Sequence, residues 1–338
     1  MNNTILVTGA AGFIGFHLCK RLLALNYRVC GIDNMNSYYS VDLKRARLSE
    51  LKKYESFIFF EQSVGDSKKL DSVLDEIRPS IIFHLAAQAG VRYSIENPRA
   101  YLESNIDETF NLLEALRKLD LKHFLFASTS SAYGASREEL LSEDLACQTP
   151  MSFYSATKLS CEAMCHAYSN IYDLNITAMR FFTVYGPYGR PDMALMKFID
   201  SIHNDRNIQL YNSGNMKRDF TYVGDVVDAL IKLKDIVPVK GAEIFSEDTL
   251  SPVANYRLLN VGNGNPKDLS VFLSFIEERL EKKAKVENLP MQPGDVLSTW
   301  ADTSLLDKLI PDRERTEIQV GINNSVDWYL KDGKRFFK

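Results

Sequence analysis

Three evenly spaced glycines constrain the fold of this chain more than any other feature. Gly9, Gly12 and Gly15 directly follow the apolar run Ile5–Thr8 and open a helical pattern over Phe13–Leu25. Glycine permits a tight turn and a close approach of backbone to ligand, and the start of a helix offers free N–H groups and partial positive charge. The pattern therefore predicts a strand, a turn and a helix that together hold a pyrophosphate.

The chain continues with the same alternation of short apolar runs and helical patterns. This alternation is typical of βαβ units, in which helices cover both faces of a parallel sheet. We therefore predict an α/β fold with a Rossmann-type, doubly wound parallel sheet. Further strands are expected at Arg28–Ile32, Phe57–Phe60, Ile81–His84, Phe124–Ala127 and Ile176–Arg180, and helices at Lys69–Ile77, Ala100–Leu119 and Ser155–Tyr172.

The pattern of the sequence changes after Thr183, where Gly and Pro become frequent and the expected helices and strands become shorter. Residues Val237–Ala254 are rich in turn-forming types and are expected to form a loop. We predict a dinucleotide-binding domain over residues 1–182 and a smaller α/β C-terminal substrate lobe over 183–338. Some segments of the second half, such as Leu258–Val261, are expected to return to the main sheet.

The composition excludes several classes of protein. A net charge of −4 over 338 residues gives no general attraction to nucleic acid or to an anionic membrane. No apolar run approaches the roughly 20 residues that a membrane-spanning helix needs. The five cysteines form no CxxC pair and suggest neither a metal site nor a disulfide framework. We expect a protein of the reducing cytoplasm that binds no metal.

Two acidic residues are candidates for recognising the adenosine part of a dinucleotide. Asp33 ends the second expected strand, where a carboxylate accepts hydrogen bonds from ribose hydroxyls and repels a 2′-phosphate. This position favours NAD over NADP, although an ordinary Asp at a strand end is the alternative. Asp66 follows the third strand and is a weaker candidate for facing the adenine, since a turn-forming Asp explains it almost as well.

A tyrosine and a lysine four residues apart are the main candidates for catalysis. Tyr154 and Lys158 share one face of a predicted helix, and the hydroxyl-rich segment from Ser128 to Ser131 leaves the end of the fifth strand, at the edge where parallel sheets bind ligands. A nearby ammonium and a cationic nicotinamide would favour the phenolate of a tyrosine. A solvated helix face and a Ser-rich turn are the alternatives, and the preceding dinucleotide motif makes them less favourable.

The glycine spacing together with this Tyr and Lys resembles the extended branch of the short-chain dehydrogenase/reductase family. The segment Leu85–Gln88 after the fourth strand resembles the part of that family that passes along the cofactor. The resemblance implies NAD as cofactor. The cofactor contacts that it implies are Gly9, Gly12, Phe13, Ile14, Gly15, Asp33, Asp66, Leu85, Ala86, Ala87, Gln88, Tyr154 and Lys158.

Over nearly its whole length the chain resembles the nucleotide-sugar epimerases and dehydratases of that family. In this family a hydroxyl residue follows the fifth strand, and Thr129 falls at that position here. The dehydratases carry an Asp and then a Glu directly after it, and decarboxylases of UDP-glucuronate tend to keep the Glu. Ser130 and Ser131 occupy these positions here. Without carboxylates, the proton transfers of an elimination lose their acid and base, so the departure favours an epimerase.

The second half resembles the part of the family that binds the nucleotide sugar. A guanidinium suits paired phosphate oxygens, an aromatic ring stacks on uracil, and small residues leave room around the sugar. Gln292 stands where many UDP-galactose epimerases have an Arg, so the diphosphate would depend more on Arg218. The substrate contacts that the resemblance implies in this part of the chain are Thr183, Arg190, Tyr211, Arg218, Asp295 and Thr299.

The segments around Gly189–Ala194, Gln88–Ser94 and Met291–Asp295 resemble UDP-glucuronate 4-epimerases in particular. A hexuronate carboxylate needs partners when it leaves water, and Ser130, Ser131, Thr183 and Arg190 are predicted to supply them. Oxidation at carbon 4 creates a β-keto acid, and the hydroxyls are predicted to hold its carboxylate so that carbon dioxide is not lost. UDP-glucose or UDP-galactose and UDP-N-acetylhexosamines remain open, because Thr299 is small.

The predicted reaction interconverts UDP-glucuronate and UDP-galacturonate. Tyr154 removes the proton of the 4-hydroxyl, Thr129 orients the oxygen, Lys158 supports the phenolate, and NAD is regenerated in each cycle. A nucleotide-sugar dehydrogenase or reductase with exchangeable cofactor, and an NAD-binding scaffold without catalysis, are the rival interpretations. The helices at Ala100–Leu119 and Ser155–Tyr172 resemble those of the family's dimer interface, which implies a homodimer.

Overall fold

A seven-stranded parallel sheet forms the centre of the protein in a computed structural model that describes residues 4–292, 294 and 296–337. Every strand pairs in parallel with its neighbours, and six of the seven were expected within residues 1–182. In spatial order the strands are β11 (Tyr256–Val261), β6 (Ile176–Phe181), β5 (His123–Thr129), β4 (Ile81–His84), β1 (Thr4–Thr8), β2 (Arg28–Asp33) and β3 (Phe57–Glu61).

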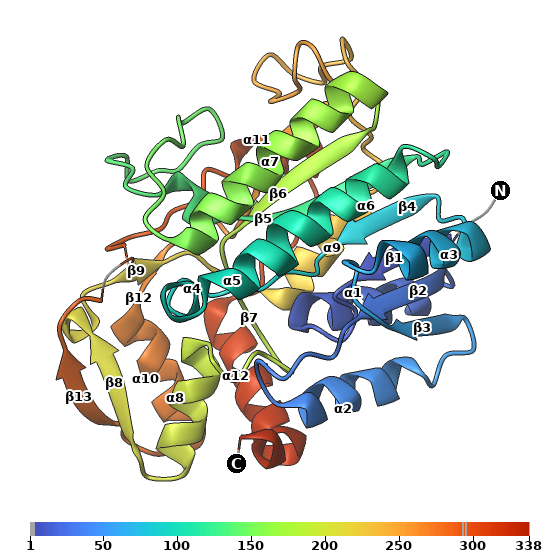
Figure 1. Ribbon diagram of the computed structural model, residues 1–338. Coiled ribbons are helices and arrows are strands. Elements are labelled where there is room, and N and C mark those ends of the chain that lie inside the picture. Colours follow the sequence, from blue (N-terminus) through green and yellow to red (C-terminus); the bar gives the residue numbers. More distant parts are fainter. Residues whose placement is uncertain (1–3, 293, 295, 338) are drawn as a thin grey trace.

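Helices cover both faces of this sheet (Figure 1). Because the strands are buried on both sides, they read as nearly continuous apolar runs rather than as alternating patterns. One face packs against α3 (Ser67–Ile77), α6 (Glu108–Leu116) and α7 (Phe153–Tyr172). The other face packs against α1 (Phe13–Ala24), α2 (Val41–Leu51), α9 (Val223–Leu233) and α11 (Ser304–Leu309).

The helix predicted over Ala100–Leu119 is divided into three parts. It consists of α5 (Pro98–Tyr101), the π-helical segment η1 (Leu102–Asp107) and α6. The wider turns of η1 coincide with Asn105, whose buried side chain accepts a hydrogen bond from Gln88 N at 2.9 Å and donates to Gln88 O at 3.1 Å. This segment therefore fixes the backbone of the loop after β4, which periodicity in the sequence does not reveal.

A smaller lobe lies at the carboxyl edge of the sheet (Figure 1). Its own core is lined by residues such as Phe198, Ile199, Phe272 and Ile276. Two parallel strands, β8 (Asn207–Tyr211) and β13 (Lys285–Leu289), pack with α8 (Ala194–His203), α10 (Leu269–Leu280) and α12 (Ile318–Trp328). Short pairs complete it, namely β7 (Thr183–Tyr185) with β10 (Phe220–Tyr222) and β9 (Lys217–Arg218) with β12 (Lys267–Asp268).

Parts of the second half of the chain belong spatially to the central sheet. Strand β11 extends its edge beyond β6, which is the return anticipated for Leu258–Val261. Helix α9 packs against α1 through Val226, Val227 and Leu230. Between them, residues Val237–Ala254 form the predicted loop. The substrate lobe is therefore tied to the sheet by several chain crossings.

None of the helices in the described part of the chain is long and apolar enough to cross a membrane. The five cysteines are free thiols, and Cys161 and Cys165 are both buried along α7.

Candidate active site

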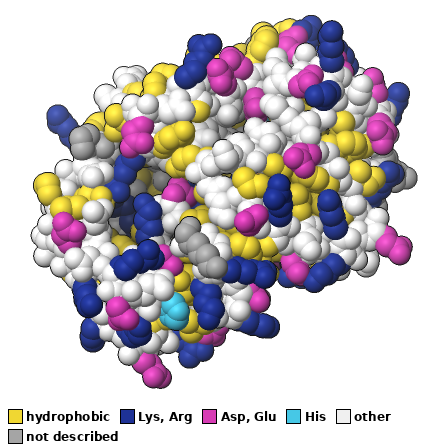
Figure 2. Space-filling view, turned by 60° about the horizontal axis from the view of Figure 1, so that its bottom comes forward, with side chains coloured by type: hydrophobic (Ala, Val, Ile, Leu, Met, Phe, Trp, Pro, Cys, Tyr) yellow, Lys and Arg dark blue, Asp and Glu magenta, His cyan; other side chains and the backbone are white. Residues whose placement is uncertain are grey.

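A large cleft separates the carboxyl edge of the sheet from the smaller lobe. Its volume is about 1040 Å³, and residues of both halves of the chain line it. Figure 2 shows a hollow on this face with Lys and Arg side chains around it. The carboxyl edge of a doubly wound sheet is where such folds bind ligands, and this cleft has room for more than one of them.

The glycine turn after β1 forms a cradle that only glycine fits. Gly9 has φ +71°, and a Cβ there would lie 2.8 Å from Ala86 N. A Cβ at Gly15 would lie 2.1 Å from Gly9 O, and Gly12 caps the start of α1 in an extended conformation. All three glycines line the cleft together with Phe13 and Ile14, so the first N–H groups of α1 face the space where a pyrophosphate fits.

Asp33 lines the cleft at the end of β2, as a ribose-binding acid should. Its carboxylate is 8% exposed and accepts hydrogen bonds from Ala11 N at 3.1 Å and Met35 N at 2.9 Å. Lys44, which sequence reasoning missed, brings its ammonium to 4.0 Å from Asp33 and donates to Asn36 O at 2.9 Å. The cation thus compensates the buried acid on the adenosine side of the cleft.

Asp66 has a different role from the one proposed for it. It is not among the described residues that line the cleft. Its carboxylate caps the N-terminus of α3 by accepting from Lys69 N at 3.2 Å, and it pairs with the Lys69 ammonium at 3.0 Å. An Asp at this position satisfies a free N–H of the helix, which explains the residue without a ligand. The prediction of an adenine contact at Asp66 is therefore corrected.

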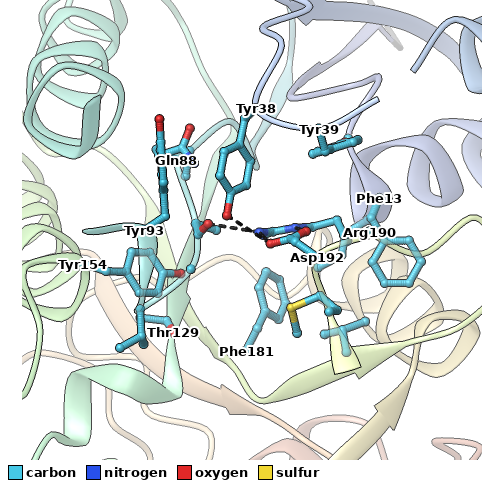
Figure 3. Close-up of a pocket in the computed structure, with 18 of the residues that line it drawn as sticks. Phe13, Tyr38, Tyr39, Gln88, Tyr93, Thr129, Tyr154, Phe181, Arg190 and Asp192 are labelled. Atoms are coloured by element: carbon cyan, nitrogen blue, oxygen red, sulfur yellow. Dashed lines mark hydrogen bonds and ion pairs between the residues drawn. The ribbon is translucent and has the colours of Figure 1, made fainter. Parts of the chain in front are cut away.

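Tyr154 and Thr129 face each other across one end of the cleft (Figure 3). Thr129 is the last residue of β5, and Tyr154 lies in the first turn of α7, which Ser152 caps by accepting from Ser155 N at 3.1 Å. Burial raises the pKa of Tyr154, while its hydrogen bond with Thr129 and the positive charge of Arg190 act in the opposite direction. The phenol is thus poised beside a hydroxyl and a cation.

Lys158 lies one turn further along α7 and also lines the cleft. It is 2% exposed, its ammonium lies 4.2 Å from the centre of the Phe126 ring, and burial lowers its pKa. Within the described chain it makes no hydrogen bond or ion pair with another residue. The sequence predicted that Lys158 lowers the pKa of Tyr154, but in the protein alone Thr129 and Arg190 exert that influence and burial outweighs them.

The segment Leu85–Gln88 passes along the cleft opposite the glycine turn. Asn105 fixes its backbone, and the Nε2 group of Gln88 is buried without a hydrogen-bond partner in the described structure. A buried amide and a buried ammonium at Lys158 both need acceptors, which ribose and carboxamide oxygens can provide. Together with the glycine cradle, these groups fit a bound dinucleotide.

Three small hydroxyl residues line the same cleft as Tyr154 and Thr129. Ser130 and Ser131 begin the short helix η2 (Ser130–Tyr133) directly after Thr129, and Thr183 begins β7. All three line the cleft, and in the described chain none of their hydroxyl groups hydrogen-bonds to another residue. They are therefore available to hold oxygen atoms of a ligand near Tyr154.

Arg190 reaches into the middle of the cleft and is held there by other residues (Figure 3). Asp192 accepts from its Nε at 3.0 Å and from its Nη2 at 2.5 Å, and Ala89 O accepts from Nη2 at 3.0 Å. Tyr38, from the loop after β2, donates to the same Asp192 at 3.1 Å. The roles of Asp192 and Tyr38 were not predicted. Asp192 lies two residues from Arg190 in the segment Gly189–Ala194, but Tyr38 is 154 residues away from Asp192, and residues so far apart carry no joint signal in the sequence.

Tyr211 and Arg218 line the opposite end of the cleft, on the smaller lobe. Arg218 Nη1 donates to the backbone oxygens of Lys217 at 2.8 Å and Leu297 at 3.2 Å, which sets the direction of its guanidinium. Arg92, from the loop after β4, lies 4.1 Å from the centre of the Tyr211 ring and lines the cleft as well. The ring therefore forms part of a contact that joins the two halves of the protein.

Two further predictions concern the segment near residue 295. Asp295 lies outside the described residues. Thr299 is buried and is not among the described residues that line the cleft; its hydroxyl accepts from Asp219 N at 3.3 Å. The side chain of Thr299 serves the backbone of the neighbouring segment, and its control of the room around the sugar stays a prediction. Within the described residues, no group of three His, Cys, Asp or Glu is placed to hold a metal ion.

Comparisons with known proteins all indicate the same family of epimerases. Residues 5–238 match the NAD dependent epimerase/dehydratase family. The chain is 46% identical to Protein CapI of Staphylococcus aureus, over 98% of this chain and 99% of that one. It is 42% identical to a probable UDP-glucuronate 4-epimerase of Rhizobium meliloti, over 98% of each. The crystal structure of UDP-glucuronic acid 4-epimerase from Bacillus cereus with UDP-glucuronic acid and NAD superposes with a TM-score of 0.87 at 32% identity, covering 97% of this chain and 99% of that one.

Proposed function

The chain belongs to the NAD-dependent epimerase/dehydratase family, and from this premise we propose that it is a UDP-glucuronate 4-epimerase. The enzyme interconverts UDP-glucuronate and UDP-galacturonate by transient oxidation at carbon 4 of the sugar. The observation that carries the proposal is the position of Arg190. Its guanidinium lines the same cleft as Tyr154 and Thr129 and lies close enough to lower the pKa of the Tyr154 phenol.

NAD is the cofactor of this family, and when bound it supplies a group that accepts and returns hydride at carbon 4. The residues proposed to hold it are the glycine cradle, Asp33 and the segment Leu85–Gln88, with Lys158 at the catalytic end. The unpartnered ammonium of Lys158 suits the hydroxyl groups of a ribose. Phe13 and Ile14 would cover the pyrophosphate from the first turn of α1.

Tyr154 is proposed as the proton acceptor for the 4-hydroxyl of the sugar and, after the sugar has turned, as the proton donor. Thr129 keeps the reacting oxygen within reach by hydrogen bonding to it and to the phenol. Burial raises the pKa of Tyr154, so in the protein alone the phenol stays protonated and little of the basic phenolate is present. Added positive charge at the catalytic end of the cleft would lower the pKa of Tyr154 toward neutral pH, so that more of the basic phenolate forms.

The UDP part of the substrate is proposed to lie against the smaller lobe, with Arg218 at the diphosphate and Tyr211 at the uracil. The anchor holds the nucleotide while the oxidised sugar turns in the space between Thr183 and Tyr154. Asp295 stays a predicted contact of the nucleotide ribose. A fixed guanidinium matches paired phosphate oxygens, and the backbone hydrogen bonds of Arg218 fix its direction.

The hexuronate carboxylate is proposed to meet Ser130, Ser131, Thr183 and Arg190. The three hydroxyls are without partners in the described chain and donate hydrogen bonds, while the guanidinium supplies positive charge. Hydrogen bonds that hold the carboxylate out of line with the carbonyl π system would slow loss of carbon dioxide from the β-keto acid. Without acids at positions 130 and 131, the carboxylate also meets no like charge there.

A 4-epimerase of neutral UDP-sugars is the second candidate, and one observation favours it. Asp192 already accepts hydrogen bonds from both Nε and Nη2 of Arg190. The net positive charge that faces the sugar is therefore smaller than the charge of an unpaired guanidinium. A neutral sugar would leave this pair intact. A carboxylate gains from Arg190 only through its remaining Nη1 group or by displacing Asp192.

We also propose the larger organisation that the sequence suggested. Residues 1–182 form the cofactor domain and 183–338 the substrate lobe, apart from segments such as β11 and α9 that return to the sheet. A homodimer through α6 and α7 is supported by the exposed apolar side chains of Phe110, Ile171 and Tyr172 on these helices. The cytoplasm is the proposed compartment, since the five cysteines are free.

The test is to incubate the purified protein, without added NAD, with UDP-glucuronate, UDP-glucose and UDP-N-acetylglucosamine separately and to follow the products by proton NMR. Conversion of UDP-glucuronate to UDP-galacturonate is the expected result, with bound NAD carried through purification. Conversion of only a neutral sugar would keep the epimerase chemistry and reject the role of Arg190. Steady accumulation of NADH from added NAD would instead indicate a dehydrogenase.

A further inference from the structure

The adenosine end of the cleft contains a buried acid that no motif indicated. Because Asp33 ends β2 and the glycine turn follows β1, the base of a bound dinucleotide lies beyond Asp33, toward the end of β3. The cleft is lined there by Gln62, Ser63 and Val64 after β3, and by Ser104 and Glu108 from the helical segment that crosses this face. Asp66, the acid that sequence reasoning placed here, points instead to the N-terminus of α3.

Glu108 is the first residue of α6, and its side chain belongs to the cleft wall although the residue is only 9% exposed. The Ser63 hydroxyl donates to its Oε1 at 2.6 Å. No Lys, Arg or His of the described residues forms an ion pair with it. Burial raises the pKa of Glu108 to about 6, with the charge of Asp33 acting in the same direction and the Ser63 hydrogen bond against it. It is thus an ionised acceptor at neutral pH that lacks a full set of donors.

The surroundings hold this carboxylate in one place. A Cβ at Gly65 would lie 3.1 Å from Ser63 Oγ and 3.4 Å from Glu108 Cγ, so a glycine in this turn leaves room for both side chains. One helical turn after Glu108, Asn111 Nδ2 donates to Gly65 O at 3.1 Å and ties α6 to the turn. Two segments that lie more than forty residues apart in the chain are therefore held together at this point by hydrogen bonds.

We propose that Glu108 recognises the base of the dinucleotide by accepting a hydrogen bond from the exocyclic 6-amino group of adenine. An ionised carboxylate has no proton to donate, so it selects a purine with a 6-amino group and rejects one with a 6-oxo group. Ser63 is the positioning residue that keeps one carboxylate oxygen occupied and the other directed to the cleft. The inference rests on NAD as the cofactor in the proposed function.

The experiment compares NAD with nicotinamide hypoxanthine dinucleotide, in which a 6-oxo group replaces the 6-amino group. Holoenzyme is equilibrated with an equal excess of both dinucleotides and desalted, and the retained nucleotides are quantified by chromatography. We expect the wild type to retain NAD at least about tenfold in preference, since the lost contact is a charge-assisted hydrogen bond. Glu108→Gln, whose amide also donates, should reduce this preference about tenfold or reverse it.

Asp66→Asn is the matched control, because it removes an acid from the same region that does not line the cleft, and it should keep the wild-type preference. Equal retention of both dinucleotides by the wild type would overturn the inference without any variant. An unchanged preference in a folded Glu108→Gln protein would overturn it too. Epimerisation of UDP-glucuronate, measured on the same samples by NMR, tests the proposed function separately, because either dinucleotide carries the same nicotinamide.

Discussion

At the glycine turn the recognition surface of the cleft is mainly backbone, whereas around Arg190 it consists of side chains that include one from a distant segment. Gly9, Gly12 and Gly15 form one short turn, and its shape is set within seven residues of sequence. Arg190 depends on Asp192 beside it and, through Asp192, on Tyr38 more than 150 residues away. A backbone site tolerates almost no added atoms, and a side-chain site is sensitive to the loss of single groups.

The largest effect is expected from an added methyl group at the cofactor end. Gly9→Ala places a Cβ 2.8 Å from Ala86 N, so we expect loss of bound NAD and, with it, of activity. Gly241→Ala is the matched control, because Gly241 has φ +77° but no atom within 4 Å of its Cβ position. Both variants bear a backbone strain of about 1–2 kcal/mol. The fall in melting temperature of Gly241→Ala therefore shows how much of the fall in Gly9→Ala comes from this strain alone.

Nucleotide content of the purified variants, read by absorbance after denaturation, separates the two contributions. Retention of NAD by Gly9→Ala would show that the turn can open, and the contrast between the two ends of the cleft would then fail.

A smaller but selective effect is expected from removing the guanidinium at the substrate end. Arg190→Gln should lower kcat/KM for UDP-glucuronate about 10²-fold, because a buried charged partner is lost and Asp192 is left unpaired. Bound NAD should stay at the wild-type level. Lys240→Gln removes an exposed cation far from the cleft and controls for the change in net charge. Equal losses for UDP-glucuronate and UDP-glucose would show that Arg190 shapes the site without reading the carboxylate.

At the junction of the two ends, Thr129→Val should lower kcat about tenfold through loss of one hydrogen bond to the reacting oxygen. The pH dependence offers a second measurement. Because the Thr129 hydrogen bond opposes the effect of burial, its removal raises the pKa of Tyr154 further. Activity requires the basic form of the phenol, so the rising limb of the pH–rate profile should move to higher pH. An unmoved limb in a folded variant would assign that limb to another group.

The smallest effect concerns product partition. Ser131→Ala and Thr183→Ala should each increase the carbon dioxide released per UDP-galacturonate formed by roughly threefold, since each hydroxyl holds the carboxylate out of alignment. Ser160→Ala, an exposed hydroxyl on α7 that donates only to Ala156 O, serves as control. Equal carbon dioxide release from the wild type and both variants would mean that the hydroxyls do not restrain the carboxylate.

The sequence was most informative where recognition is local. The parallel sheet followed from buried strands alternating with amphipathic helices, and six of its seven strands were placed to within two residues at each end. The glycine cradle, the Tyr154 helix and the hydroxyl at Thr129 all follow from short motifs next to the strands that position them. In each case the residues that act together are close in the chain or lie at the ends of adjacent strands.

Side chains in isolation were less informative. Asp66 and Thr299 are of the right type for their predicted roles, but each satisfies a backbone N–H nearby. Conversely, Glu108 belongs to no motif that the sequence analysis recognised. Asp192 lies in the segment Gly189–Ala194, but its pairing with Arg190 was not predicted. The place of both acids in the cleft depends on how α6 and the loop after β7 pack. The division of the helix over Ala100–Leu119 by η1 was also missed, because it coincides with a tertiary contact of Asn105 with the Gln88 backbone, which the apolar pattern does not record.

The sequence by itself therefore determined the fold class, the glycine turn and the proximity of Tyr154 to Thr129, because these depend on contacts between residues near one another in the chain or at one sheet edge. Tertiary structure alone decided which charges share the cleft. The hydrogen bond from Tyr38 to Asp192, the acid that pairs with Arg190, joins two separate segments, and so do the approach of Lys44 to Asp33 and the burial of Glu108 against Ser63. A charge becomes a binding group only when folding removes its water and fixes its partners, and sequence patterns do not record that step.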